Sequence, residues 1–432
     1  MILTSLPRDP PLQDWLAHIE RLHAQPIALG LERVLAVGRA LGVTPWAPLI
    51  TVGGTNGKGS TCAMLERILL CAGYRVGLYT SPHLIDYNER VRIDGVPVAG
   101  AALCAAFARV EAARGATPLT YFEFGTLAAW VAFAEAGVDV LILEVGLGGR
   151  LDAVNAFDAD CAVVASIDLD HMEFLGETRE AIGFEKAGIF RAGRPAIVGD
   201  AQPPHSLLEY AASIGADLQV LGRDFGYLTE PGQWTWWGRR GRRGGLAHPA
   251  LRGAIQLANA STAISALDAL AARLPVSMQD IRRGLSEVEL PGRFQVLPGR
   301  PTLVLDVAHN PQAAGVLADN LGCMAFHPET WGVFGMLADK DAAGVAARLK
   351  GRVDHWLLAD LPGPRGMRAE ALARVLADQG LTVEGCFASP AECYRAARER
   401  AGEDDRIAAF GSFLTVAGVL QAISDERKRS TT

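Results

Sequence analysis

The chain has 432 residues, half of them hydrophobic, which is enough material for roughly two or three domains with substantial cores. Its formal net charge of −7 argues against a nucleic-acid-binding protein, because such proteins usually carry a basic balance. No apolar run reaches the roughly 18 residues of a membrane-spanning helix, and the N-terminus lacks the pattern of a secretory signal. We therefore expect a cytoplasmic protein that has no membrane partner.

Helical and apolar strand patterns alternate in the larger, N-terminal part of the chain. A helical pattern is expected over residues 14–41, with a break around 25–30. Short apolar runs predict strands just before residue 53 and at 75–80, 138–144, 161–167 and 196–198. Apolar strands that alternate with helices are typical of a parallel sheet covered on both faces, so we expect an α/β domain with a parallel-rich sheet.

Residues 290–301 are rich in Pro, Gly and Arg, as linkers often are. After them the α/β pattern starts again, with a helix expected over 309–321 and strands at 302–308, 331–337, 355–361 and 407–413. We therefore divide the chain into an N-terminal domain of residues 1–295 and a smaller, Rossmann-like α/β domain of residues 296–432.

One segment combines aromatic and basic residues. Residues 234–245 contain three tryptophans, followed by Arg239, Arg240, Arg242 and Arg243. Such a segment could contact nucleic acid or another polyanion. The simpler interpretation is a solvated hairpin or loop, because a short run of charge is weak evidence for a ligand.

A glycine-rich turn, GGTNGKGS at residues 53–60, lies between a predicted strand and a predicted helix. Backbone N–H groups of such a turn can approach phosphate oxygens, and Lys58 would reach the β- and γ-phosphates of a nucleotide. In the strict P-loop pattern Ser or Thr directly follows the lysine, whereas here Gly59 precedes Ser60. We predict an ATP site in a P-loop-type ATPase domain, formed by Asn56, Gly57, Lys58, Gly59 and Ser60; a turn without a ligand is the alternative.

The chain resembles the folylpolyglutamate synthase/dihydrofolate synthase branch of the Mur ligase superfamily, and most of all its bacterial bifunctional members. The glycine after the lysine of GGTNGKGS is typical of that branch. Further matching segments include YTSPHL (79–84), NERVRIDG (88–95), YFEFGTLAA (121–129), LEVGLGGRLDAVN (143–155), EKAGIFR (185–191), DVAHNP (306–311) and GSFLTVA (411–417). The resemblance implies a monomeric enzyme that uses ATP to join L-glutamate to dihydropteroate, or to the γ-carboxylate of a folate, through an acyl phosphate.

Glu144 closes a strongly apolar predicted strand. A carboxylate there would lie at the edge of a parallel sheet where ligands bind, and could hold Mg²⁺; the alternative is a surface glutamate. The resemblance implies that Ser81, Glu144 and His171 are the Mg²⁺ ligands. It also implies that Lys186, in a predicted helix, carries a carbamate, which would turn a cation into an anion. The alternative for Lys186 is an ordinary solvated lysine.

For the nucleotide, the resemblance implies contacts from Asn259, Arg293 and Asp306 to adenine, phosphate and ribose. From the sequence alone, a helix-face asparagine and a linker arginine are the simpler interpretations of the first two. In the C-terminal domain the resemblance indicates His309 as a catalytic residue and Ser412 as a ligand for the incoming glutamate. Their alternatives are a loop histidine and a serine that caps a helix.

For the pterin acid, the resemblance implies three segments of the N-terminal domain. They are Ala28, Leu29, Gly30 and Leu31; Tyr121, Phe122, Glu123 and Phe124; and Leu151, Asp152 and Ala153. Phe122 and Phe124 could instead belong to the core, since apolar residues two apart suit a buried strand face. Bacterial members often carry Asp where this chain has Ala28, which leaves open whether dihydropteroate is used as well as folate.

Two rivals come from other classes. A Mur ligase for cell-wall precursors usually has an additional N-terminal domain, for which the residues before the phosphate loop are too few. A P-loop ATPase acting as a regulatory module would hydrolyse ATP without an acid and an amino acid. Phosphate release that requires both glutamate and a pteroate would exclude the second rival.

Overall fold

The computed structural model describes residues 10–431, so the first residues, on which the expectation about a secretory signal partly rests, lie outside it. The chain forms two compact units. Unit 1 comprises the chain up to Ala250 and Leu257–Val288, and unit 2 comprises Leu251–Gln256 and Glu289–Thr432. The sequence pattern does not predict that residues 251–256 belong to unit 2. Among residues 10–431, no helix is both long and apolar enough to cross a membrane.

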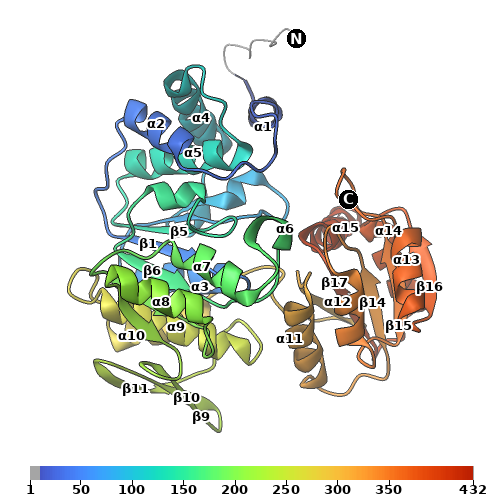
Figure 1. The fold of residues 1–432 in the computed structure, drawn as a ribbon. Coiled ribbons are helices and arrows are strands. Elements are labelled where there is room, and N and C mark those ends of the chain that lie inside the picture. Colours follow the sequence, from blue (N-terminus) through green and yellow to red (C-terminus); the bar gives the residue numbers. More distant parts are fainter. Residues whose placement is uncertain (1–9, 432) are drawn as a thin grey trace. The chain divides into compact units, whose positions relative to one another are not determined.

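Unit 1 is built on an eight-stranded sheet with the order β4-β3-β2-β5-β1-β6-β7-β8 (Figure 1). All neighbours from β2 to β8 pair in parallel, and β3 and β4 add an antiparallel edge. The strands are β1 (Leu49–Gly53), β2 (Val76–Tyr79), β3 (Val91–Ile93), β4 (Val96–Pro97), β5 (Val140–Glu144), β6 (Cys161–Val164), β7 (Pro195–Val198) and β8 (Asp217–Val220). The predicted parallel-rich sheet is confirmed, because every predicted strand of this part falls on one of these elements.

The helices of unit 1 begin with α1 (Leu12–Ile19) and α2 (Glu32–Leu41), separated by a longer break than the pattern predicted. The others are α3 (Lys58–Cys71), α4 (Gly100–Arg114), α5 (Tyr121–Ala136), α6 (Met172–Leu175), α7 (Arg179–Ala187), α8 (His205–Ile214), α9 (Ile255–Ala269) and α10 (Met278–Glu287). Two short 3-10 helices, η1 (Tyr87–Arg90) and η2 (Ala153–Ala156), follow β2 and β5 along the chain.

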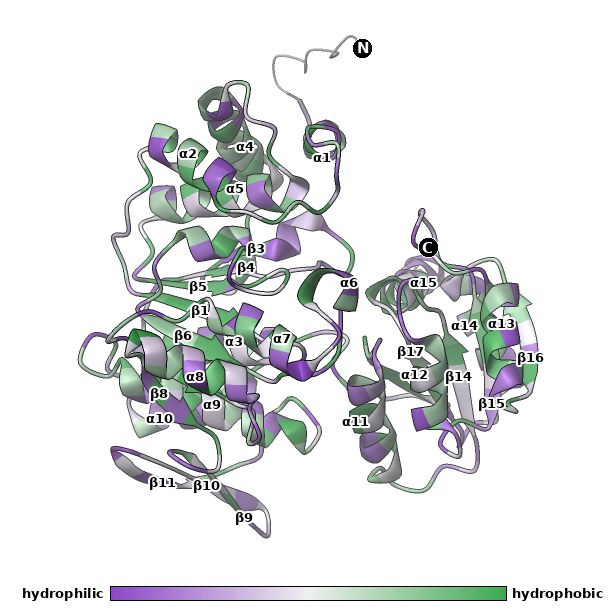
Figure 2. Ribbon diagram, viewed as in Figure 1, coloured by the Kyte–Doolittle hydropathy of each residue, from purple (hydrophilic) through white to green (hydrophobic). Residues whose placement is uncertain are grey.

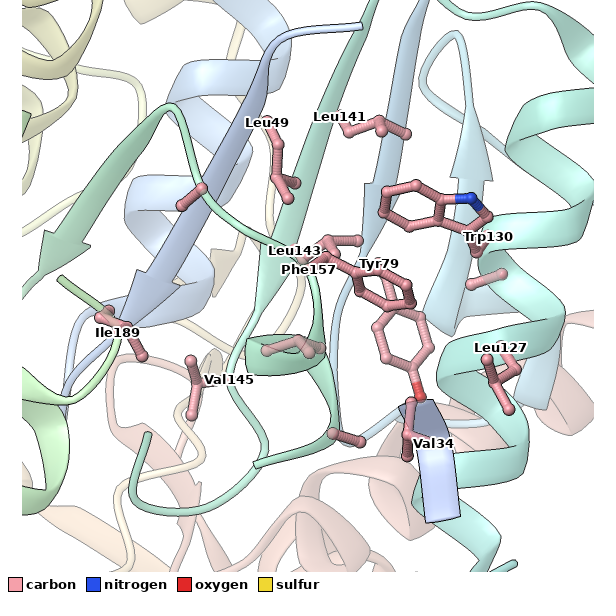
Figure 3. Close-up of a cluster of buried hydrophobic side chains, with 14 of the residues drawn as sticks. Val34, Leu49, Tyr79, Leu127, Trp130, Leu141, Leu143, Val145, Phe157 and Ile189 are labelled. Atoms are coloured by element: carbon pink, nitrogen blue, oxygen red, sulfur yellow. The ribbon is translucent and has the colours of Figure 1, made fainter. Parts of the chain in front are cut away.

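The core of unit 1 lies where α5 packs on the sheet. The central strands β1, β5 and β6 are buried along their whole length, and Figure 2 shows them as hydrophobic. Trp130 of α5 stacks on Phe157 at 3.9 Å between ring centroids (Figure 3). Two aromatic side chains at a stacking distance stabilise the packing beyond the area that they bury.

The idea that Phe122 and Phe124 lie on a strand face is wrong, because both lie in the first turn of α5. Thr120 and Glu123 form a capping box, in which each side chain accepts a hydrogen bond from the other residue's backbone N–H. This satisfies two of the N–H groups that a helix start leaves without partners. Phe124 is fully buried, so the core interpretation of that residue is confirmed.

The Trp- and Arg-rich segment belongs to a separate three-stranded antiparallel sheet of β9 (Gly226–Glu230), β10 (Gln233–Gly238) and β11 (Gly241–Leu246). The predicted hairpin is confirmed, but it is not simply solvated. Trp234 and Trp236 are buried, and Trp236 Nε1 donates to Ser265 Oγ at 3.1 Å. Arg243 pairs with Asp268 at 3.1 Å and lies over the Trp236 ring. At least one arginine of this basic segment is therefore paired with an acid of the same unit.

Unit 2 contains a six-stranded sheet with the order β12-β13-β17-β14-β15-β16, parallel except for β12. Its strands are β12 (Gln295–Leu297), β13 (Thr302–Leu305), β14 (Thr330–Phe334), β15 (His355–Ala359), β16 (Val383–Phe387) and β17 (Arg406–Phe410). Its helices are α11 (Pro311–Gly322), α12 (Ala342–Leu349), α13 (Ala369–Asp378), α14 (Pro390–Arg400) and α15 (Phe413–Thr431). The expectation of a second, smaller α/β fold is confirmed.

Candidate active site

Four neighbouring parallel strands of unit 1, β2, β5, β1 and β6, end at the same edge of the sheet. Directly after these ends come Ser81, Glu144, the phosphate loop and the segment 165–171. In open α/β sheets ligands bind outside the carboxyl ends of the strands. The topology thus gathers predicted metal and nucleotide residues that are far apart in the sequence.

The phosphate loop is held in shape by the segment that follows β6. Thr55 N donates to Ser166 O at 2.7 Å, and Asn56 N donates to Ser166 Oγ at 3.2 Å. Thr55 Oγ1 donates to Asp168 O and accepts from Asp168 N, both at 3.0 Å. Because these bonds fix the backbone, the N–H groups of the loop have defined directions before any ligand arrives.

Lys58 is the first residue of α3, and its ammonium group contacts the backbone of the phosphate loop. Its Nζ donates to Gly54 O at 3.0 Å and to Thr55 O at 3.2 Å. Ser60 is buried in the first turn of the same helix. The cation and the positive end of the helix therefore face the same loop, an arrangement that favours phosphate.

Asn259 of α9 lies directly against this loop, although about 200 residues separate the two in the chain. A Cβ atom on Gly57 would come within 2.6 Å of Asn259 Oδ1. Gly57 has a φ of 85°, which favours glycine, and Asn259 is buried. Asn259 does lie on a helix, as the simpler interpretation of a helix-face asparagine has it, but the face that carries it is packed against the phosphate loop.

Glu144 and Ser81 are in contact at the same edge. Ser81 N donates to Glu144 Oε2 at 3.1 Å, and Glu144 is only 5% exposed. The alternative of a surface glutamate is therefore wrong. His171 is the N-cap residue just before α6, with a φ of 49°, and its backbone N–H donates to Asp170 Oδ1 at 2.9 Å. Among residues 10–431, no three His, Cys, Asp or Glu side chains form a metal-binding group, so a site here would need the Ser81 oxygen as well.

Lys186 of α7 is buried at 3% exposure, so the interpretation as a solvated lysine is wrong. Burial, together with the nearby positive charge of Lys58, lowers the pKa of Lys186 to about 7. Asp170 and Asp152 act in the opposite direction. An amine with this pKa has a large neutral fraction at neutral pH, which distinguishes it from ordinary lysines. Asp170 was not predicted as a site residue, because its place near Lys186 depends on the fold.

The three segments predicted to bind the pterin acid come together in unit 1. Gly30 N donates to Leu151 O at 3.1 Å, which joins the first segment to the third. Arg33 Nη2 donates to Ala28 O at 2.6 Å and lies 2.8 Å from Glu123 Oε1, which joins the first segment to the second. Arg33 was not predicted, although it lies only two residues after the first segment. Both carboxylate oxygens of Glu123 accept hydrogen bonds from Arg33, and Oε2 also accepts from Thr120 N in the cap of α5.

Asp152 is buried, and its carboxylate is held by backbone groups. Oδ2 accepts from Leu147 N at 2.8 Å and Oδ1 accepts from Val154 N at 3.1 Å. Burial nevertheless raises the pKa of Asp152 to about 7. The Phe122 ring packs so closely on Gly146 that a Cβ there would lie 2.7 Å from it. A carboxyl group and an aromatic ring thus lie beside the turn that follows β5.

The other residues of the three segments differ in exposure. Ala153 and Phe124 are buried, whereas the half-buried side chains are Ala28, Leu29, Leu31, Tyr121, Phe122 and Leu151. Half-buried apolar and aromatic side chains around a few polar groups are typical of small-molecule sites.

Unit 2 brings together its own set of predicted residues at the ends of β13 and β17. Asp306 accepts hydrogen bonds from Phe294 N and Ala308 N, both at 2.8 Å, and its burial raises the pKa of the carboxyl group. The Arg293 guanidinium lies 5.0 Å from the Phe413 ring centroid. Arg293 also opposes the rise in the Asp306 pKa, which places its charge near that carboxylate.

His309 and Ser412 lie near the same loops. His309 Nδ1 lies 2.8 Å from Val307 O, and the histidine ring is 6.3 Å from the Phe413 ring. Ser412 is buried, and its Oγ accepts from Leu414 N at 3.2 Å, which is the helix-capping arrangement considered as the alternative. A helix cap and a ligand contact are not exclusive for one hydroxyl group, since it has two acceptor lone pairs and a donor.

Comparison with known proteins agrees with this organisation. Residues 52–203 match the Mur ligase middle domain, and residues 292–413 match the Mur ligase glutamate ligase domain. The chain is 47% identical to the dihydrofolate synthase/folylpolyglutamate synthase of Escherichia coli K12 over 418 residues, 96% of each chain. It is 42% identical to the Haemophilus influenzae protein of the same name over 429 residues, 94% of this chain and 96% of that one.

Solved structures show the same similarity. E. coli FolC in complex with DHPP and ADP has a TM-score of 0.92 at 47% identity, covering 96% of this chain and 98% of that one. The Yersinia pestis bifunctional enzyme complexed with AMPPNP and Mn ion has a TM-score of 0.91 at 46% identity, covering 97% of this chain and 100% of that one.

The fold, the phosphate loop and the two matched domains define an ATP-dependent ligase of the Mur ligase superfamily that uses glutamate. Within that superfamily the chain belongs to the dihydrofolate synthase/folylpolyglutamate synthase family. The cell-wall ligase and the ATPase module fit less well, because the similarity to folate ligases covers nearly the whole chain.

Proposed function

We propose that this ligase joins L-glutamate both to dihydropteroate and to the γ-carboxylate of a reduced folate. The observation that carries the proposal is the assembly of the three acid-binding segments beside Asp152 and Phe122, in the unit that also holds the phosphate loop. Ala28 contributes its carbonyl oxygen, which Arg33 contacts, and any residue supplies that group. The absence of Asp at this position therefore leaves in place the Arg33 contact that joins the first segment to the second.

The reaction that fits this site begins when an acid carboxylate oxygen attacks the γ-phosphorus of ATP and ADP leaves. The glutamate amine then attacks the acyl carbon, phosphate leaves, and the amine proton passes to a base. Lys58 and the N–H groups of residues 56–60 stabilise the charge on the transferred phosphoryl group. We assign Arg293 and Asp306 to the phosphate and ribose of the nucleotide, and Asn259 to its base.

We assign the base to His309 and a glutamate contact to Ser412. When His309 Nδ1–H donates to Val307 O, Nε2 is the nitrogen that can accept a proton. This tautomer is inferred from the hydrogen bond. His309→Gln should lower the rate of amide formation more than the affinity for ATP, because its role lies in the second step.

We propose Mg²⁺ as the metal, held by Ser81, Glu144 and His171. The Glu144 carboxylate is buried and accepts a hydrogen bond from the Ser81 backbone N–H, which supports this assignment because Mg²⁺ prefers oxygen ligands. When bound, the ion supplies positive charge to the phosphate oxygens of the nucleotide. Glu144→Gln should raise the Mg²⁺ concentration that is needed for half-maximal activity, while the unfolding midpoint without metal changes little.

We further propose that Lys186 is carbamylated. A neutral amine can attack CO₂, forming an N–C bond and releasing one proton, and the pKa of about 7 provides that neutral amine. A ¹³C signal from ¹³CO₂ that is present in the native enzyme and absent in Lys186→Arg would support the assignment. Activity that is independent of CO₂, together with no such signal, would refute it.

The first experiment is Mg²⁺- and ATP-dependent phosphate release with L-glutamate, offering dihydropteroate and tetrahydrofolate in separate reactions. We expect both acids to gain one glutamyl unit by mass. Release with the folate alone would limit the enzyme to folylpolyglutamate synthesis, and release with neither would refute the proposed substrates.

We also propose that the enzyme is a cytoplasmic monomer, for which light scattering should give about the chain mass of 45.9 kDa.

A further inference from the structure

Arg90, the last residue of η1, lies against the aromatic side of the acid-binding region of unit 1. Its guanidinium carbon is 5.4 Å from the ring centroids of both Tyr87 and Tyr121. Tyr121 is the first residue of the second acid-binding segment, and it is half-buried, as is Arg90. A guanidinium held by two aromatic rings keeps its charge and has a restricted position.

No carboxylate neutralises Arg90 within the part of the chain that the structure describes. Its Nε donates to His83 Nδ1 at 2.8 Å, and burial together with the charge of Arg90 lowers the His83 pKa to about 4, so His83 is neutral. The adjacent acid, Glu89, is used elsewhere, since its oxygens accept from the N–H groups of residues 84, 85 and 86 at 2.7–2.8 Å. Neither terminal nitrogen of Arg90 has a hydrogen-bond partner among residues 10–431.

The backbone of Arg90 lies close to the strand end at which we expect the acid to react. Thr80 N donates to Arg90 O at 2.9 Å, so Arg90 lies beside the residue that precedes Ser81. Ser81 in turn contacts Glu144 at the strand ends. The backbone of Arg90 therefore lies beside the strand end where the phosphoryl group is expected, while its guanidinium lies over two aromatic rings, one of which belongs to an acid-binding segment.

We propose that Arg90 binds the α-carboxylate of the terminal glutamate when a folate is the acceptor. The inference rests on the proposed function. It adds a residue that should matter when a folate is the acceptor and not when dihydropteroate is. Dihydropteroate has a single carboxylate, which becomes the acyl phosphate. A folate places a second carboxylate next to the reacting γ-carboxylate, and the unpaired guanidinium offers the two parallel N–H groups that a carboxylate accepts.

The test compares Arg90→Gln with the native enzyme on both acceptors. Loss of a charge-assisted contact should lower kcat/KM about 10- to 100-fold for tetrahydrofolate, while kcat/KM for dihydropteroate should change by less than about threefold. Arg109→Gln is the matched control, because Arg109 is exposed and pairs with the exposed Glu135, which lies at the opposite end of α5 from Tyr121. It should leave both values unchanged. Equal losses with both acceptors, or no loss with either, would overturn the proposal.

A second measurement does not depend on how the variant folds. Tetrahydrofolate with an α-carboxamide in place of the α-carboxylate should be about 10- to 100-fold poorer for the native enzyme. Arg90→Gln should treat this analogue and tetrahydrofolate alike, because each change removes the same contact. Native enzyme that uses the analogue as well as tetrahydrofolate would overturn the proposal. A native enzyme inactive with both natural acceptors would instead refute the proposed function.

Discussion

Replacing Gly57 by alanine tests whether the shape of the phosphate loop depends on its contact with Asn259. Gly57 has a φ of 85°, and Gly73, at the other end of α3, has a φ of 87°. An alanine in this left-handed region costs about 1–2 kcal/mol at either position. The surroundings differ, because the new Cβ would lie 2.6 Å from Asn259 Oδ1 at Gly57 but would meet nothing within 4 Å at Gly73.

Gly73→Ala should therefore lower the free energy of unfolding by about 1–2 kcal/mol and leave kcat/KM within about threefold. Gly57→Ala should lose about 1–3 kcal/mol more, because either the loop or Asn259 must move. A displacement on the order of 1 Å in a positioning group can cost about 100-fold in rate, so we expect at least that loss of ligase activity.

Urea unfolding measures the first effect, and calorimetric titration with a non-hydrolysable ATP analogue followed by phosphate-release assays measures the second. Equal stability and activity in the two variants would show that backbone strain alone matters. Unchanged nucleotide affinity in Gly57→Ala would refute the view that the Asn259 contact shapes the ATP site.

Three other changes test separate features. Lys186→Met should abolish product formation. In CO₂-free buffer, where the native amine is not carbamylated, it should nevertheless raise the free energy of unfolding at pH 7, by at most about 5 kcal/mol for a pKa lowered from 10.5 to about 7. The folded amine loses its proton at a lower pH than the unfolded one does, so the free energy of unfolding of the native enzyme should rise relative to that of the variant between about pH 7 and pH 10. Urea unfolding at several pH values measures this, and a difference between the two proteins that does not change with pH would contradict it. Trp236→Ala should cost about 3–5 kcal/mol in the same titrations, whereas the exposed Arg240→Ala should change stability by less than about 0.5 kcal/mol; similar effects would show that the hairpin is peripheral. Asp152→Asn should raise KM for dihydropteroate and leave affinity for ATP unchanged, and a large loss of ATP affinity by calorimetry would place Asp152 in a different role.

Local patterns predicted the elements of the fold because they depend on neighbours in the chain. Apolar runs at 138–144 and 161–167 correspond to β5 and β6, and the GGTNGKGS turn joins a strand to a helix as expected. The error at Phe122 and Phe124 is instructive, since apolar spacing of two residues suggested a strand. Thr120 and Glu123, a Thr-x-x-Glu capping box, were the local signal for a helix start.

The sequence by itself determined the α/β class, the phosphate loop and the family, because these depend on short motifs in a fixed order. The tertiary structure alone decided that Lys186 is buried, that Asn259 lies on Gly57, and that Arg90 has no acidic partner within residues 10–431. Burial and charge pairing are set by residues far away in the chain, which parallel strands bring to one edge of the sheet. A residue's charge state and its available hydrogen bonds therefore follow from packing, and no local pattern contains them.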